Sequence, residues 1–171
     1  MKADRAKTPT AKPLYTDEQR RRRDASPWTL VQGVLAPIQF AVFLVSAALV
    51  VRFLLTENGA YAATVSVVVK TLTLYTIMIT GAIWERRVFG RYLFADAFYW
   101  EDVFSMLVLA LHTAYLVALF TGALEARPLA LLALAAYATY VVNAAQFVLK
   151  LRAARLQAQS QAPALQWEPS R

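Results

Sequence analysis

The stretch from Trp100 to Thr121, WEDVFSMLVLALHTAYLVALFT, decides the fold of this chain. It opens on two acidic residues, Glu101 and Asp102, and is then almost wholly apolar, with one histidine, His112, deep inside it. A helix of about 20 apolar residues is long enough to cross roughly 30 Å of hydrocarbon. The stretch therefore predicts a membrane-spanning helix.

Three more apolar blocks of similar length accompany it, so the predicted spans are residues 30–55, 61–84, 100–121 and 128–149. The chain is 58% hydrophobic, above the composition of soluble domains. We therefore expect an all-α polytopic membrane protein, a four-transmembrane-helix bundle formed by residues 26–156.

The two ends of the chain differ from this core. Residues 1–25 are a polar, basic tail in which Thr16 and Gln19 have the spacing of a capping box, which predicts a short surface helix from Asp17 to Arg23. Such a tail is not a signal peptide. Residues 157–171 are polar and contain Gln and Pro, so we expect a disordered tail.

Positive charge orients the bundle. Of the 18 Lys and Arg residues, all but Lys70, Arg52 and Arg127 lie in the N-terminal tail, the loop between the second and third spans, or the C-terminal segment. The positive-inside rule then predicts that both termini are cytoplasmic. Because no nucleic-acid motif accompanies the basic tail, we expect it to meet lipid headgroups of the bilayer and not nucleic acid. The absence of Cys excludes disulfides and thiol catalysis.

Lys70 and His112 are ionisable residues at similar depth inside the predicted spans. Such residues are costly in hydrocarbon, so they are functional candidates. Lys70 could pair with a carboxylate or carbonyl of a substrate, and His112 could ligate the metal of a macrocycle or shuttle a proton. The structural alternative for both is a polar contact between neighbouring helices.

Glu85, Glu101 and Asp102 stand at one membrane depth near the predicted cytoplasmic surface. Carboxyl groups that converge there could divide the roles of acid and base. Adjacent helical residues point about 100° apart, so we expect one of Glu101 and Asp102 to face the bundle and the other the headgroups. Alternatively, these two acids stabilise the start of a helix, and Glu85 forms a surface ion pair with Arg86 or Arg87.

Tyr140 and Asn143 belong to a polar and aromatic stripe on the last span, with Tyr137 and Gln146. The stripe could bind a ligand or hold helices together. Six aromatic residues in and beside the loop before the third span form an interfacial belt or the edge of a flat apolar pocket; they are Phe89, Tyr92, Phe94, Phe98, Tyr99 and Trp100.

Several long strings, spread over about Leu14 to Arg155, resemble the 3-vinyl bacteriochlorophyllide hydratases. They are LYTDEQR (14–20), RDASPWT (23–29), TGAIWE (80–85), VFGRYLF (88–94), WEDVFSM (100–106) and LALHTAY (109–115). The resemblance implies a hydro-lyase that adds water to the 3-vinyl group of a chlorophyllide in bacteriochlorophyll biosynthesis, in a bacterial inner or intracytoplasmic membrane. It implies no redox cofactor, and the magnesium belongs to the pigment.

From the chemistry of vinyl hydration, we expect Glu101 or Asp102 to act as the acid and Glu85 or the other acid as the base. Lys70, His112, Tyr140 and Asn143 are the candidate substrate-binding residues. His112 as ligand to the pigment magnesium is hard to combine with Glu101 as the acid, because about 16 Å separates them along one helix.

Other functions and partners stay open from the sequence. A non-enzymatic pigment-binding or assembly protein fits the histidine and the aromatics equally well. A small transporter is disfavoured because the first span contains no interior acid and the chain has no internal repeat. Neighbouring enzymes of the pathway or a second copy of the chain are further possible partners.

Overall fold

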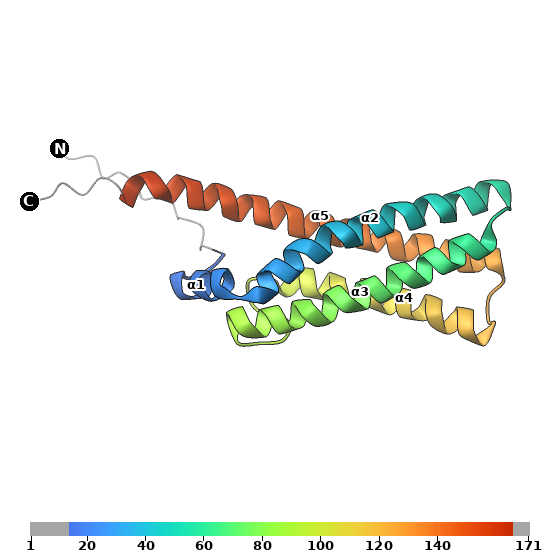
Figure 1. Cartoon of the computed structure of the whole chain (residues 1–171), viewed down its shortest axis with the longest axis horizontal. Coiled ribbons are helices and arrows are strands. Elements are labelled where there is room, and N and C mark those ends of the chain that lie inside the picture. Colours follow the sequence, from blue (N-terminus) through green and yellow to red (C-terminus); the bar gives the residue numbers. More distant parts are fainter. Residues whose placement is uncertain (1–13, 166–171) are drawn as a thin grey trace, which may run out of the picture.

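The structure, a computed structural model, describes residues 14–165 and the side chains of residues 14–156. It is all-helical over this range. The five helices are α1 (Asp17–Ala25), α2 (Pro27–Thr56), α3 (Ala60–Phe89), α4 (Tyr99–Thr121) and α5 (Ala126–Leu165). Helices α2 to α5 form an elongated bundle, and α1 lies at one end of it (Figure 1).

The predicted spans and surface helix are present. Helices α2 to α5 each contain one predicted span, and all four are long and apolar enough to cross a membrane. The capping box is formed: the Gln19 N–H donates to Thr16 Oγ1 over 3.2 Å, and the Thr16 N–H donates to Gln19 Oε1 over 2.9 Å. The expectation of a surface helix is confirmed, and α1 runs to Ala25.

Helix α5 continues beyond the predicted end of the last span. It remains helical to Leu165, across part of the segment expected to be a disordered tail. The residues added to the helix are rich in Ala, Gln and Leu, which all favour helix, and this local preference outweighs their polarity. Residues 166–171 of the predicted tail, and residues 1–13 of the N-terminal tail, lie outside the described range.

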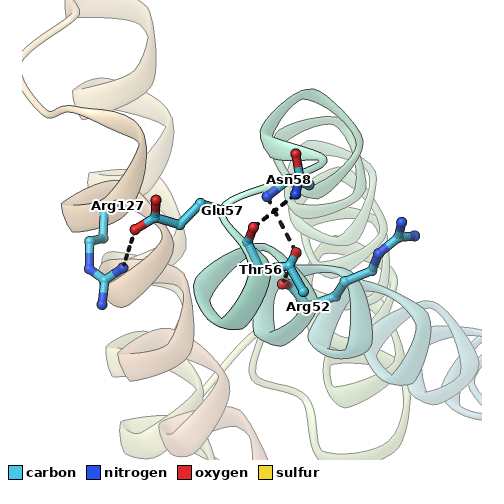
Figure 2. Close-up of polar contacts among 5 residues, drawn as sticks. All are labelled: Arg52, Thr56, Glu57, Asn58 and Arg127. Atoms are coloured by element: carbon cyan, nitrogen blue, oxygen red, sulfur yellow. Dashed lines mark hydrogen bonds and ion pairs between the residues drawn. The ribbon is translucent and has the colours of Figure 1, made fainter.

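The bundle consists of two antiparallel hairpins. Helix α2 packs mainly on α3, and α4 packs mainly on α5, while contacts between the hairpins are sparser. The α2–α3 turn is tight because Glu57 and Gly59 both adopt positive φ. Glu57 also pairs with Arg127 at the start of α5 over 3.4 Å, which ties the hairpins together at this end (Figure 2).

The bundle has an apolar outer surface and a core that contains both apolar and polar side chains. Large apolar side chains such as Leu55, Tyr61 and Phe120 are exposed on its outside, as expected for contact with lipid. Among the residues whose side chains are described, ten polar or charged ones are buried inside: Gln39, Ser46, Lys70, Thr71, Glu85, Glu101, Asp102, Ser105, His112 and Asn143. The interior is therefore where a polar site can form.

Candidate active site

Three carboxyl groups meet at the end of the bundle that carries α1. Glu85 comes from the last turn and a half of α3, and Glu101 and Asp102 come from the first turn of α4. All three are buried, with exposed fractions of 5%, 6% and 4%. The carboxyl groups of Glu85 and Asp102 lie within hydrogen-bonding reach of each other. The structure thus brings together the three acids that the sequence identifies as catalytic candidates.

Two of the expectations about these acids are wrong. Neither Glu101 nor Asp102 faces the headgroups, because α3 covers Asp102 on one side and α5 covers Glu101 on the other. Glu85 does not form a surface ion pair with the arginines that follow it. Its carboxylate points inward, while Arg86 donates to the carbonyl oxygen of Gly90.

The loop between α3 and α4 holds two of the acids through its backbone. The Phe94 N–H donates to Asp102 Oδ2 over 2.7 Å, and the next N–H, that of Ala95, donates to Glu85 Oε2 over 3.4 Å. Phe94 has a φ of 59°, in the left-handed region that a bulky residue rarely adopts. This strained backbone turns two successive amides toward the acid pair, as in an anion-binding nest.

Lys150 is a member of the site that the sequence analysis did not identify. Its Nζ lies 2.5 Å from Glu101 Oε2, and its side chain is 26% exposed. Nζ also lies 5.1 Å from the centre of the Phe98 ring. The signal in the sequence was that Lys150 directly follows the last apolar block, but there it served only as a topology marker. Glu101 therefore forms an ion pair with a lysine, whereas Glu85 and Asp102 contact each other.

An aromatic cluster closes this end of the bundle. Tyr15, which directly precedes the capping residue of α1, stacks on Phe89 at 5.8 Å, and Phe98 stacks on Phe147 of α5 at 5.8 Å. The Trp84 indole donates to Thr29 Oγ1 over 3.0 Å. Burial raises the pKa of Tyr15, and the nearby Arg23 guanidinium counteracts part of this rise. The cluster screens the acids from the solvent beside α1.

Other aromatic side chains of the same region face outward. Tyr92, Phe94, Tyr99 and Trp100 are exposed by between 37% and 66%. Tyr99 contacts both Phe94 and Trp100, with ring centres 5.8 and 5.6 Å apart. The six aromatics that the sequence groups together thus divide into an inner pair, Phe89 and Phe98, and an outer surface next to the acids.

The predicted substrate-binding residues gather deeper in the bundle. Lys70 and His112 are fully buried and close enough to interact electrostatically. Lys70 Nζ lies 3.8 Å from the centre of the Tyr140 ring. Asn143, one turn further along α5, donates to Ser105 Oγ over 2.9 Å. A polar stripe therefore runs inside the bundle from the acids to its centre.

His112 adopts one defined tautomer. Its Nδ1 lies 2.8 Å from the carbonyl oxygen of Val108, which can only accept, so Nδ1 carries the proton. Its Nε2 is buried and has no partner among the residues whose side chains are described. Nε2 is thus an acceptor in the bundle centre. No group of His, Cys, Asp and Glu in the described range is arranged to hold a metal ion.

The arrangement can perform acid–base chemistry beside the membrane surface. Two carboxyl groups in contact and shielded from water favour a shared proton, because two adjacent negative charges repel each other strongly. Glu101, in contrast, is balanced by the Lys150 ammonium group. The Glu85–Asp102 pair and the Glu101–Lys150 ion pair therefore lie side by side, an arrangement that suits a general acid and a general base.

Comparison with known proteins identifies the family of this chain. Residues 15–153 match the family described as 2-vinyl bacteriochlorophyllide hydratase (BCHF). The chain belongs to this family. The vinyl group numbered 2 in this name is the substituent numbered 3 in the other nomenclature of the macrocycle. The matched residues include all three acids, Lys70, His112 and Lys150.

Two curated relatives carry the family name. The 2-vinyl bacteriochlorophyllide hydratase of Rhodobacter capsulatus is 66% identical over 153 residues, which are 90% of this chain and 89% of the relative. That of Cereibacter sphaeroides is 65% identical over 143 residues, which are 84% of this chain and 89% of the relative. No solved structure matches the chain.

Proposed function

We propose that this protein is a membrane-bound hydro-lyase that adds water across the vinyl group of a bacteriochlorophyllide-type pigment to give the 1-hydroxyethyl pigment. Family membership supports the reaction. The observation that supports the site is the contact between the buried carboxyl groups of Glu85 and Asp102 beside the Glu101–Lys150 ion pair.

The first step is protonation of the vinyl group. The Glu85–Asp102 pair transfers its proton to the terminal CH2 carbon, whose π electrons form the new C–H bond. The positive charge develops on the carbon attached to the ring, where conjugation with the macrocycle spreads it. The pair then carries one more negative charge, which stabilises the cation across a medium of low dielectric constant.

The second step is attack by water. A lone pair of the water oxygen forms the C–O bond at the cationic carbon, and the Glu101 carboxylate accepts the proton that the bound water loses. Proton exchange with solvent then returns both groups to their starting states. Solvent reaches this end of the bundle at the partly exposed Lys150 side chain. The net change is addition of one water molecule, without an oxidant or a cofactor.

The remainder of the pigment is placed between the hairpins in this proposal. A flat apolar ring suits the bundle interior, with the vinyl edge at the acids and the rest of the ring along the polar stripe toward Asn143 and Tyr140. The outer aromatic surface formed by Phe94, Tyr99 and Trp100 offers rings on which the pigment can stack before it enters.

The same proposal includes the orientation of the bundle in the membrane. The acid end carries α1 with its arginines, the α3–α4 loop and the basic part of α5, so it faces the cytoplasm by the positive-inside rule. The membrane is then the bacterial inner membrane or its intracytoplasmic extensions. Water and pigment meet at its cytoplasmic face.

The test is conversion of the vinyl pigment by membranes that contain this protein. The expected product is heavier by one water, loses the vinyl absorption contribution and incorporates heavy oxygen when the reaction is run in isotopically enriched water. Recovery of unchanged vinyl pigment bound to the protein would instead indicate a non-enzymatic pigment carrier. Membranes without the protein are the control.

A further inference from the structure

Two buried basic side chains at the centre of the bundle are unpaired. Lys70 Nζ and His112 Nε2 are shielded from solvent, and neither forms a hydrogen bond with any residue in the range 14–156. Such groups are costly inside a membrane protein. The acid–base chemistry at the other end of the polar stripe does not use them, so their burial requires another explanation.

The unpaired state is not a general property of this core. Ser46 Oγ lies 2.8 Å from Ser66 Oγ and 2.5 Å from the Tyr137 hydroxyl group, which joins α2, α3 and α5. Ser105 and Asn143 are joined through Asn143 Nδ2. Among the residues whose side chains are described, the unpaired buried atoms lie on Lys70 and His112, and also on Ser26, Gln39, Asn143 and Gln146.

The depth of Lys70 relative to the acids corresponds to the size of one pigment. Tyr140, which contacts Lys70 Nζ, stands ten residues before Lys150 on α5, which is about 15 Å at 1.5 Å per residue. Lys70 itself stands fifteen residues before Glu85 on α3. The separation is close to the diagonal of a substituted tetrapyrrole ring.

The pigment ring is placed between α3 and α4 in this scheme. Helix α3 makes far fewer contacts with α4 than with α2, although both α3 and α4 contribute residues to the polar stripe. Tyr75 and Thr113 join α3 and α4 near this depth through their hydroxyl groups at 2.8 Å.

We infer that Lys70 anchors the pigment by donating a hydrogen bond from Nζ to an acceptor oxygen on the edge of the ring opposite the vinyl group. We take the acceptor to be either the free propionate carboxyl group or the ring ketone, which both lie away from the vinyl-bearing edge. The inference rests on the proposed function. His112 supplies no donor to that oxygen, because its Nε2 is an acceptor.

The Tyr140 ring supports this role of Lys70. Its face lies 3.8 Å from Nζ, close enough for a cation–π contact that holds the ammonium group in place without using any of its N–H donors. The three N–H groups thus remain free for the pigment oxygen. Lys70 is a positioning residue in this scheme, and it takes no part in proton transfer to the vinyl group.

The first experiment uses the unmodified protein with three pigments and measures binding by absorption. The pigments are the vinyl chlorophyllide, its propionate methyl ester, and its analogue in which a CH2 group replaces the ring ketone. We expect one of the two altered pigments to bind about tenfold more weakly than the parent. Loss with the ester identifies the carboxylate as the acceptor, and loss with the other pigment identifies the ketone. Equal binding of all three would overturn the inference.

The second experiment compares Lys70→Met, Lys70→Arg and Thr71→Val. Lys70→Met should raise KM for the parent pigment about tenfold, leave kcat within a few-fold, and remove the discrimination between parent and altered pigment. Lys70→Arg should retain part of that discrimination. Thr71 is the buried neighbour whose hydroxyl group bonds within its own helix, so Thr71→Val is the control for packing and should discriminate as the unmodified protein does.

Failure of the inference can be told from failure of the proposed function. If the unmodified protein binds the pigments but hydrates none of them, the proposed function fails while the binding comparison still tests Lys70. If hydration proceeds and Lys70→Met discriminates among the pigments like the unmodified protein, the anchor is wrong and the acid site stands.

Discussion

At the scale of single residues, the surroundings of each carboxyl group indicate its role. Asp102 accepts a hydrogen bond from Phe94 and contacts Glu85, whereas Glu101, its neighbour in sequence, pairs with a lysine. Two adjacent residues thus differ because different helices cover them. We expect Asp102→Asn to lower hydration about 100-fold or more, the contribution usual for a general acid, while pigment binding is retained. Product formation under single-turnover conditions measures the effect.

A matched control for Asp102 is available in the neighbouring loop. Asp96 has a 94% exposed side chain and pairs only weakly with Arg91, at 3.7 Å. Asp96→Asn removes the same charge from the same end of the molecule, and its rate should stay within twofold of the unmodified protein. A comparable loss in both variants would show that overall charge, and not the acid pair, determines the rate.

Lys150 allows a second test at this scale. Lys150→Met leaves the buried Glu101 side chain without its ion-pair partner. We expect hydration to fall at least tenfold, and Lys150→Arg to retain most of the rate because the guanidinium group can also pair with a carboxylate. Initial rates at saturating pigment are the measurement. Arg152→Met, which changes an exposed residue of the same helix, should leave the rate unchanged.

At the scale of elements, the loop between α3 and α4 depends on its backbone conformation. Gly90 ends α3 with a φ of 84°, and a Cβ added there would meet nothing within 4 Å, so any cost of Gly90→Ala is conformational. We expect a loss of about 1–2 kcal/mol in the free energy of unfolding. Gly33→Ala inside α2, where a Cβ also meets open space, should be neutral or slightly stabilising. Thermal unfolding in detergent compares the two.

The sequence predicts the elements better than it predicts their contacts. Length and hydropathy identify four spans, and the Thr16–Gln19 spacing identifies α1, because these signals are local. The inward rotation of both Glu101 and Asp102 depends on the crossing of α3 and α5 over α4, and no local pattern encodes it. The same holds for Lys150, whose partner stands 49 residues away in the chain. Burial of the acids is thus a property of the packed bundle.

At the scale of the whole molecule, the prediction concerns the orientation of the bundle in the membrane, and the amino-acid sequence allows a direct test of it. It contains no Cys, so single cysteines report their own accessibility without background. Asn58→Cys places a thiol in the exposed α2–α3 turn, and Asp96→Cys places one in the exposed loop at the acid end. With the acid end in the cytoplasm, a membrane-impermeant maleimide added to intact cells stripped of their outer membrane should label position 58 and leave position 96 unlabelled until the membrane is opened. The reverse pattern would place the acids on the outer face, away from cytoplasmic water and pigment, and would contradict both the charge argument and the proposed path of substrate entry.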